Sequence, residues 1–140
     1  MIDLKSELGA RVAKRLHQES TIWLTTTGAD GMPQPRPVWF LWDEGSNTVI
    51  IFTQPSGAKV RHIEKNPKVA LNLNTNPHGG DVVVLLGQAE VLHGTLPPEL
   101  IKAYVDKYRV GMKNIGMNPE QFEQSYSTVV RVTPTKMRAF

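Results

Sequence analysis

The fold is constrained most by one segment, PQPRPVWFLW at residues 33–42. Its three prolines stand two residues apart, so one side of an extended strand loses three N–H donors. A strand tolerates this loss at the edge of a sheet or where it leaves its neighbour. Residues 38–42 are all apolar, whereas a strand with one solvated face alternates. The segment therefore predicts an edge strand with one face on a core and the other against a ligand, a helix or a second subunit.

Strands are predicted on both sides of this segment. Residues 21–27 are rich in β-branched and aromatic side chains, and so are residues 48–53. Turns rich in Gly, Asp, Asn and Ser separate them from the central strand, which we extend to residues 33–43. Because the turns are short, the three strands are expected to pair as an antiparallel meander.

Proline, glycine and periodicity predict the other elements. Strands are expected at residues 68–74, 82–93 and 127–132, and helices at 4–16, 56–65, 97–108 and from 118 onward. Asp3 and Ser56 are expected to cap the first two helices, Asn118 the last one, and Gly87 to mark a bend or bulge. Six short strands with helices between them predict a mainly β, α+β chain that forms a closed or nearly closed barrel, as one domain over residues 1–140.

Composition excludes several functions. The chain has 140 residues, a net charge of +3 and no cysteine, so disulfides, thiolate metal sites and a cysteine nucleophile are absent. Its four histidines lack metal-ligand spacing, and no phosphate-binding loop, nucleophile elbow or dinucleotide-binding glycine motif occurs. No segment is long and apolar enough to span a bilayer, and no signal peptide is recognised, so we expect a cytoplasmic protein without a membrane partner. No catalytic side chain or metal ligand is assigned.

Three features instead indicate a bound cofactor. Ser56–Lys59 begins a helix, where free N–H groups and a lysine suit an anion. Arg36 lies in an apolar, proline-rich strand and needs an anionic partner or a solvated edge. Val38, Trp39 and Phe40 offer a flat apolar wall for a planar ring. A plain turn with a solvated lysine, an arginine that reaches water and simple core packing remain the alternatives at these positions.

Several motifs, in a fixed order, carry a resemblance to a known family. They are Trp23-Leu24-Thr25-Thr26, Asp30-Gly31, Pro33-Gln34-Pro35-Arg36-Pro37-Val38-Trp39-Phe40, Lys59-Val60-Arg61-His62-Ile63, Asn66-Pro67-Lys68-Val69, Gly80-Asp81 and Arg131-Val132-Thr133-Pro134-Thr135-Lys136. Over nearly its whole length the chain resembles the pyridoxamine 5'-phosphate oxidase-like split-barrel superfamily. It is most similar to the branch of deazaflavin (coenzyme F420)-dependent oxidoreductases.

The resemblance implies a six-stranded antiparallel split β-barrel of the FMN-binding type, assembled as a homodimer with a cofactor at the interface. In flavin-binding relatives, residues at the positions of Arg36 and Lys59 hold the cofactor phosphate. Positions matching Val38 and Trp39 line the ring, and positions matching Phe52 and Thr53 contact the cofactor. The candidate cofactor-binding residues are Arg36, Pro37, Val38, Trp39, Phe52, Thr53, Ser56 and Lys59.

Two positions depart from the family pattern. His62 stands where many relatives carry asparagine. Gly57 and Ala58 stand where the oxidases place further basic residues beside the lysine, which argues against pyridoxamine phosphate oxidase activity itself.

The resulting hypothesis is an oxidoreductase that uses reduced coenzyme F420 to transfer a hydride to an unsaturated small molecule. The protein would supply orientation, a dry wall and the phosphate anchor. FMN is the alternative cofactor, because it also has a phosphate and a tricyclic ring. A non-catalytic cofactor or tetrapyrrole carrier would bind without turnover. A nucleic-acid-binding barrel is disfavoured, because the charge is small and the tryptophans lie in apolar runs.

Overall fold

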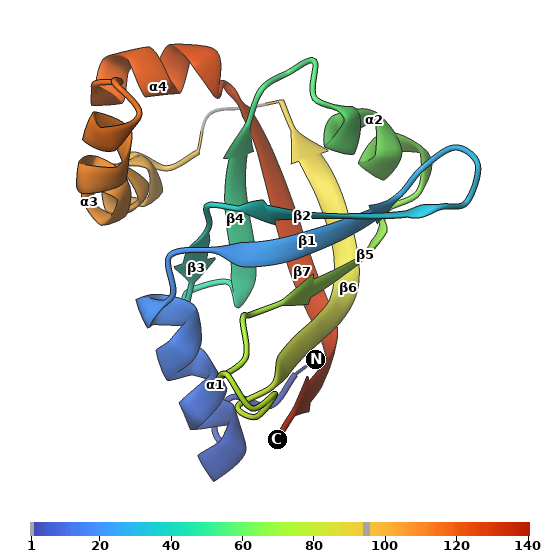
Figure 1. The fold of residues 1–140 in the computed structure, drawn as a ribbon. Helices are drawn as coiled ribbons and strands as arrows, with labels where there is room; N and C mark the ends of the chain where they lie inside the picture. The colour runs from blue at the N-terminus through green and yellow to red at the C-terminus, as the bar shows by residue number, and fades with distance from the viewer. Residues whose placement is uncertain (1, 94–95) are drawn as a thin grey trace.

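A strongly curled antiparallel sheet dominates the computed structural model, which describes residues 2–93 and 96–140 (Figure 1). In that part of the chain, seven strands are hydrogen-bonded in the order β2-β1-β5-β6-β7-β4-β3. The strands are β1 Ile22–Thr27, β2 Pro33–Val38, β3 Leu41–Asp43, β4 Thr48–Thr53, β5 Lys68–Asn72, β6 Val83–Leu92 and β7 Thr128–Ala139. The helices described are α1 Glu7–Gln18, α2 Ala58–Lys65, α3 Pro98–Asn114 and α4 Pro119–Ser125. This half-barrel with flanking helices confirms the α+β split-barrel prediction.

The central strand of the expected meander is in fact two strands. Residues 33–43 divide at Trp39–Phe40 into β2 and β3, which lie on opposite edges of the sheet. The β1–β2 and β3–β4 hairpins form as expected, but β2 and β3 do not pair, so the meander was wrong and the described strands number seven, not six. Three Cα steps from Val38 to Leu41 span at most about 11 Å. The sheet must therefore curl until its two edges approach at this point.

Edge position explains the prolines. β2 is a terminal strand of the sheet and pairs only with β1 among the described strands. At the edge of a sheet, the missing N–H groups of the prolines break no hydrogen bond to a neighbouring strand. Proline at an edge also hinders pairing with another chain. The predicted edge strand is therefore confirmed for residues 33–38.

The concave side of the sheet holds the main core. β1 alternates, with Ile22 and Leu24 almost fully buried, as expected for a strand with one face on a core. Val12 and Leu16 of α1 pack into the same cluster, and so does Phe40. The alternating pattern of the sequence is thus what holds α1 against this part of the sheet.

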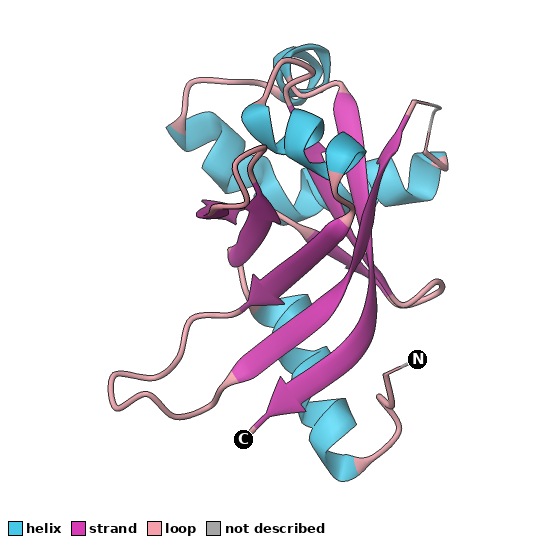
Figure 2. Cartoon of the chain, turned by 90° about the vertical axis from the view of Figure 1, so that its right-hand side faces the viewer, coloured by secondary structure: helices cyan, strands magenta, loops and turns pink. Residues whose placement is uncertain are grey.

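β6 and β7 form the longest pair, which is antiparallel; Figure 2 shows the two long strands side by side, with β7 ending at the C-terminus. Their register shifts between Leu86 and Gly87, which confirms the predicted irregularity. A Cβ atom at Gly87 would collide with the carbonyl oxygen of Thr133. β7 continues to Ala139, well past the predicted end at Val132, because it pairs with β4 in its first half and with β6 along most of its length.

Two predicted helix caps were wrong. α1 is capped by Ser6, whose hydroxyl accepts a hydrogen bond of 3.0 Å from the Gly9 amide. Asp3 instead accepts from the Lys5 amide at 2.9 Å, which closes a turn before the helix. The N-cap of α2 is Gly57, which has no side-chain cap, rather than Ser56.

The two later helices differ in how well they were predicted. Asn118 forms a capping box with Gln121 at the start of α4, as expected. α3 was expected to end near Tyr108, but it continues to Asn114 with a kink at Tyr108, where φ is −109° and ψ is 15°. None of the helices in the described ranges is long and apolar enough to cross a membrane.

Candidate functional site

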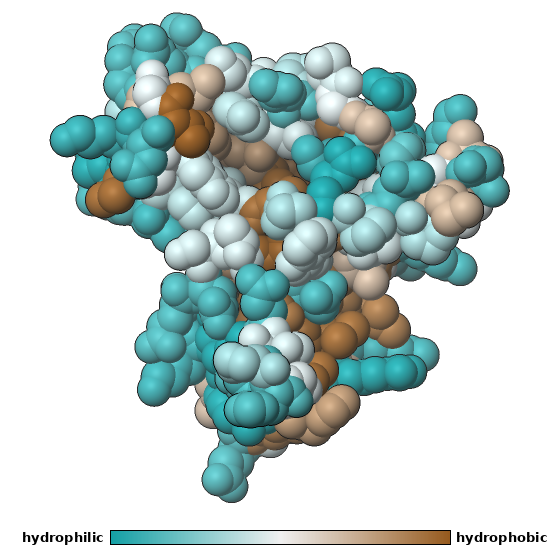
Figure 3. Space-filling model, in the orientation of Figure 1, coloured by the Kyte–Doolittle hydropathy of each residue, from teal (hydrophilic) through white to brown (hydrophobic). Residues whose placement is uncertain are grey.

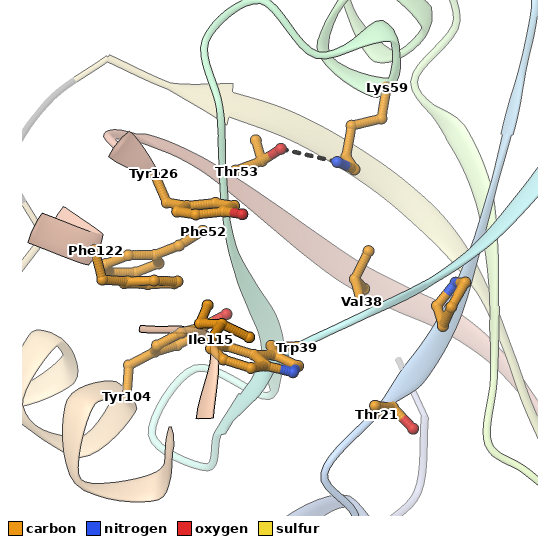
Figure 4. A pocket seen from close by; sticks show the side chains of 11 residues that line it. Thr21, Val38, Trp39, Phe52, Thr53, Lys59, Tyr104, Ile115, Phe122 and Tyr126 are labelled. Atoms are coloured by element: carbon orange, nitrogen blue, oxygen red, sulfur yellow. Dashed lines mark hydrogen bonds between the residues drawn. The ribbon is translucent and has the colours of Figure 1, made fainter. Parts of the chain in front are cut away.

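A cavity of about 390 Å³ opens between α3 and α4 on one side and the ends of β2 and β4 on the other. Its volume falls within the range of small-molecule sites. Figure 3 shows hydrophobic atoms at the floor of a hollow in this region, and Figure 4 shows the lining side chains. Six of the eight residues predicted from the sequence line it: Pro37, Val38, Trp39, Phe52, Thr53 and Lys59.

Lys59 forms a cationic end of the cavity. It lies in the first turn of α2, and its ammonium donates a hydrogen bond of 2.9 Å to the hydroxyl of Thr53 at the end of β4 (Figure 4). Burial lowers the pKa of Lys59 below the ordinary value, and the nearby positive charge of Arg36 lowers it further. Among the described residues no carboxylate pairs with this ammonium.

Arg36 does not line the cavity, but its positive charge lies close enough to act on Lys59. It lies in β2 opposite Leu24 of β1, at an inward position between the exposed Pro35 and Pro37. Its Nε is buried and has no hydrogen-bond partner in the described part of the chain. A buried unpaired donor is costly, and two neighbouring cations repel each other. This end of the cavity is therefore suited to an anionic group.

Two other residues of the sequence argument point elsewhere. Ser56 is exposed and does not line the cavity, and its carbonyl accepts a hydrogen bond of 2.9 Å from Arg61. Nδ1 of His62 lies 2.9 Å from the hydroxyl of the buried Thr26, also away from the cavity lining. Neither side chain contributes to the site as the structure describes it.

Stacked aromatic rings form the opposite wall. Trp39 and Tyr108 have ring centroids 4.6 Å apart and planes within 5°. Phe122 lies 5.7 Å from Trp39, and Tyr126 lies 4.5 Å from Phe122 with planes within 15°. Figure 4 shows the rings of Trp39, Phe122 and Tyr126 one above another beside the cavity. Offset stacking is a preferred geometry for aromatic pairs, so this wall suits a planar ring.

Part of the lining was missed by the sequence argument. These residues are Thr21, Tyr104, Ile115, Phe122 and Tyr126. A signal was present, because Tyr104 and Tyr108 are four residues apart on one helix, and Phe122 and Tyr126 likewise share a helical face. That spacing predicts an aromatic face on each helix but not which part of the sheet the face covers.

Tyr104 adds a polar group at the inner wall. Its side chain is fully buried, and its ring stacks on Phe52 with centroids 4.4 Å apart. Its hydroxyl lies near the backbone of Phe52 but makes no hydrogen bond of normal geometry with a described residue. Burial raises the pKa of Tyr104, so the hydroxyl stays protonated and able to donate.

The arrangement can bind and orient a planar molecule that carries an anionic tail. The lining residues supply an ammonium, hydroxyls and aromatic rings, and include neither a carboxylate nor a histidine in the region the structure describes. The described residues also contain no cluster of three or more side chains that could hold a metal ion. Redox or group-transfer chemistry at this site would therefore have to come from a bound cofactor.

Comparison with known proteins supports the fold. A family profile described as Pyridoxamine 5'-phosphate oxidase matches residues 8–140. No curated protein sequence matches the chain.

Solved structures share the fold at low sequence identity. A conserved hypothetical protein from Mycobacterium tuberculosis superimposes with a TM-score of 0.73 and 20% identity, covering 96% of this chain and 84% of that chain. A structure described as an F420 reductase has a TM-score of 0.64 and 21% identity, covering 89% and 94%. HutZ, a heme storage protein from Vibrio cholerae, has a TM-score of 0.70 and 15% identity, covering 96% and 95%. At these identities the similarity shows the fold alone.

Proposed function

Because the chain belongs to the pyridoxamine 5'-phosphate oxidase family, we propose that its cavity binds a redox cofactor of the flavin type. Coenzyme F420, a deazaflavin, is the preferred candidate, and FMN is the alternative. Both carry a phosphate and a tricyclic ring, which match the two ends of the cavity. The protein would act as an oxidoreductase on an unsaturated small molecule.

One observation carries this proposal: Lys59 lines one end of an aromatic cavity, and Arg36 lies close enough to act on its charge, with no described carboxylate paired to either cation. A phosphate at this end would offer Arg36 Nε a partner and would offset both the burial and the Arg36 charge that lower the pKa of Lys59. Thr53 already holds the Lys59 ammonium in place at 2.9 Å. The chain's own side chains therefore fit a phosphate without a further basic residue.

The role of the protein in such a reaction is to bind and orient. When bound, the reduced cofactor supplies the hydride, which no side chain of this chain can supply. Arg36 and Lys59 would hold the phosphate, while Val38 and Trp39 would keep the ring flat and shield it from water. Proline at position 37 leaves the edge of β2 without an N–H donor beside the ring.

A titration tests the cofactor assignment. Purified protein is mixed with increasing coenzyme F420 or FMN, and quenching of tryptophan fluorescence is followed because Trp39 lines the cavity. We expect tighter binding of coenzyme F420 than of FMN, followed by oxidation of the reduced cofactor when unsaturated acceptors are added. Micromolar binding of FMN without binding of the deazaflavin would reverse the preference, and binding of neither would overturn the proposal.

A homodimer is part of the proposal. Ile115 lines the cavity yet is 52% exposed, so the mouth of the site has an apolar rim that a second subunit would cover. The family resemblance supports the same arrangement, with cofactor sites at the interface. We also expect the protein to work in the cytoplasm with a small-molecule substrate and without a nucleic-acid or membrane partner.

A non-catalytic tetrapyrrole or cofactor carrier is the second candidate. The fold shared with a heme storage protein and the wall of stacked rings favour it. The described cavity lining, however, offers no histidine that could ligate a heme iron. Tight binding of heme, with no oxidation of reduced coenzyme F420 or FMN by any acceptor, would favour the carrier.

A further inference from the structure

The short segment Trp39–Phe40 has no strand partner. It crosses between β2 and β3, which lie on opposite edges of the sheet, so its backbone groups cannot join a ladder. Phe40 is completely buried, and buried backbone groups require hydrogen-bond partners. The partners of Phe40 therefore have to come from another element.

Helix α3 supplies them. The Phe40 amide donates to the Tyr108 hydroxyl oxygen at 2.8 Å, and the Phe40 carbonyl accepts from the Lys107 ammonium at 2.7 Å. The Tyr108 oxygen also lies 2.8 Å from the carbonyls of both Phe40 and Ser20, but a hydroxyl has one proton to donate. Because Lys107 already satisfies the Phe40 carbonyl, we assign that proton to Ser20. Tyr108 thus ties the crossing segment to the residues that lead into β1.

The same helix is shaped around the Trp39 ring. Trp39 stacks on Tyr108 with ring centroids 4.6 Å apart, at the position where α3 departs from helical geometry. One turn later, a Cβ atom at Gly111 would lie 3.1 Å from Cζ2 and 3.2 Å from Cη2 of Trp39. The indole is therefore confined between a hydrogen-bonded backbone and a helix surface that leaves no spare room.

We propose that Tyr108, with Lys107, is a positioning residue that fixes Trp39 as the rigid wall of the ligand cavity. Neither residue lines the cavity, so each acts through the Phe40 peptide and the Trp39 ring. A wall that is already rigid before binding lowers the conformational entropy that the site loses when a planar ring binds. The proposal rests on the proposed function for the identity of the ligand, but the contact itself can be tested without one.

Tyr108→Phe keeps the stacked ring and removes only the hydroxyl. We expect the affinity for FMN or coenzyme F420 to fall about five- to tenfold, because the Phe40 amide and the Ser20 carbonyl both lose their partner and Trp39 is held less firmly. Competition by inorganic phosphate, which needs Arg36 and Lys59 but not the ring wall, should stay unchanged. The tryptophan bands of the near-ultraviolet circular dichroism spectrum should also change, and the change in these bands should vanish when Trp39 is replaced by phenylalanine as well.

Gly111→Ala separates positioning from stability. Alanine favours a helix over glycine, so the melting temperature should stay level or rise. The added methyl group presses on Trp39, so the affinity for the planar cofactor should fall while phosphate competition is kept. Val110→Ala is the matched control, because Val110 is 72% exposed on the adjacent position of α3. Its cofactor affinity should equal that of the unmodified protein.

Two results would overturn the proposal. One is unchanged cofactor affinity in both Tyr108→Phe and Gly111→Ala while the unmodified protein binds. The other is a set of tryptophan bands in the near-ultraviolet circular dichroism spectrum of Tyr108→Phe that is identical to that of the unmodified protein. If the unmodified protein binds neither cofactor but the spectral coupling of Tyr108 and Trp39 is observed, the proposed function fails and the positioning contact stands. If Tyr108→Phe does not fold, Lys107→Met and Gly111→Ala provide the same comparisons.

Discussion

Arg36 and Lys59 each have unfavourable electrostatics in the protein alone. A buried Nε without a partner and a lysine with a lowered pKa both reduce the stability of the unliganded fold. Such residues are typical of functional sites, where a ligand supplies what the fold lacks.

Replacing Lys59 tests this interpretation directly. Lys59→Met should weaken binding of a phosphate-bearing cofactor by about 1.5–3 kcal/mol, the typical value of a hydrogen bond to a charged group. Its free energy of unfolding should not fall, because a partly desolvated charge beside Arg36 is removed. Isothermal titration and urea unfolding give the two quantities. Lys65→Met is the control, because Lys65 is an exposed basic residue at the other end of α2. Equal cofactor affinity in the two variants would place the phosphate elsewhere.

Lys107 predicts a pH dependence of stability. Burial lowers its pKa from 10.5 to about 8, and the charge of Glu19, the C-cap residue of α1, partly offsets this lowering. Between these values the unfolded chain binds more protons than the folded one, so this group makes stability rise with pH from about 8 to about 10.5. The effect should be on the order of 1 kcal/mol, since solvent screens a part-exposed group.

The measurement compares the unmodified protein with Lys107→Met by urea unfolding between pH 7 and pH 10.5. Subtracting the variant removes the contributions of all other titrating groups, including Tyr108. The difference in unfolding free energy should shift in favour of the unmodified protein as the pH rises. A difference that is flat across this range would show that Lys107 titrates normally.

At the level of elements, the β6–β7 pair is the main support of the sheet. Ten residues of β6 pair with β7, and the two strands follow each other through the shift at Gly87. Backbone atoms of Thr133 and Pro134 occupy the space where a Cβ atom at residue 87 would lie. Backbone cannot move aside as a flexible side chain does, so glycine is required here by close approach.

Gly87→Ala should therefore be strongly destabilising. We expect a loss of about 2–4 kcal/mol in the free energy of unfolding, because the two strands must separate to admit the methyl group. Gly45→Ala is the matched control, since its nearest neighbour would be Asp43 Oδ1 at 3.5 Å, an ordinary contact. That variant should change stability by less than about 0.5 kcal/mol. Similar midpoints of unfolding for the two variants would contradict the close-packed register.

At the scale of the whole molecule, we expect the protein to assemble into a dimer. The cavity has an apolar rim at Ile115, and the proline edge of β2 leaves one border of the sheet without strand pairing. Residues 38–42 face a core on one side and helix α3 on the other, so the helix covers part of what a second subunit was expected to cover. A second subunit would then meet the mouth of the cavity rather than the whole face of this segment.

Sedimentation equilibrium measures this directly. We expect twice the mass of one chain at micromolar concentration, with a melting temperature that falls on dilution, because a subunit interface stabilises the fold by mass action. Added cofactor should raise the melting temperature and favour the dimer if the site is completed at the interface. The mass of a single chain at every concentration, with or without cofactor, would contradict the assembly.

Local sequence was sufficient to predict most elements and to single out the two proposed charged anchors. Alternating burial in β1, the prolines of β2 and the glycine at residue 87 act through neighbouring backbone, so their consequences can be worked out from the sequence alone. Arg36 and Lys59 could be singled out in the same way, because a charge in an apolar strand and a lysine at a helix start are local features. Helix caps were harder, since Asp3 and Ser6 are both good capping residues and only geometry chooses between them.

Only the tertiary structure decided how these pieces meet. That residues 33–43 form two strands on opposite edges depends on the curl of the entire sheet, which no spacing within the segment records. The aromatic wall likewise joins Trp39 to rings from α3 and α4 that are 65 or more residues away in the chain, and Tyr108 satisfies the Phe40 amide across 68 residues. Such contacts depend on where the sheet leaves backbone groups unpaired, which is a property of the folded chain as a whole.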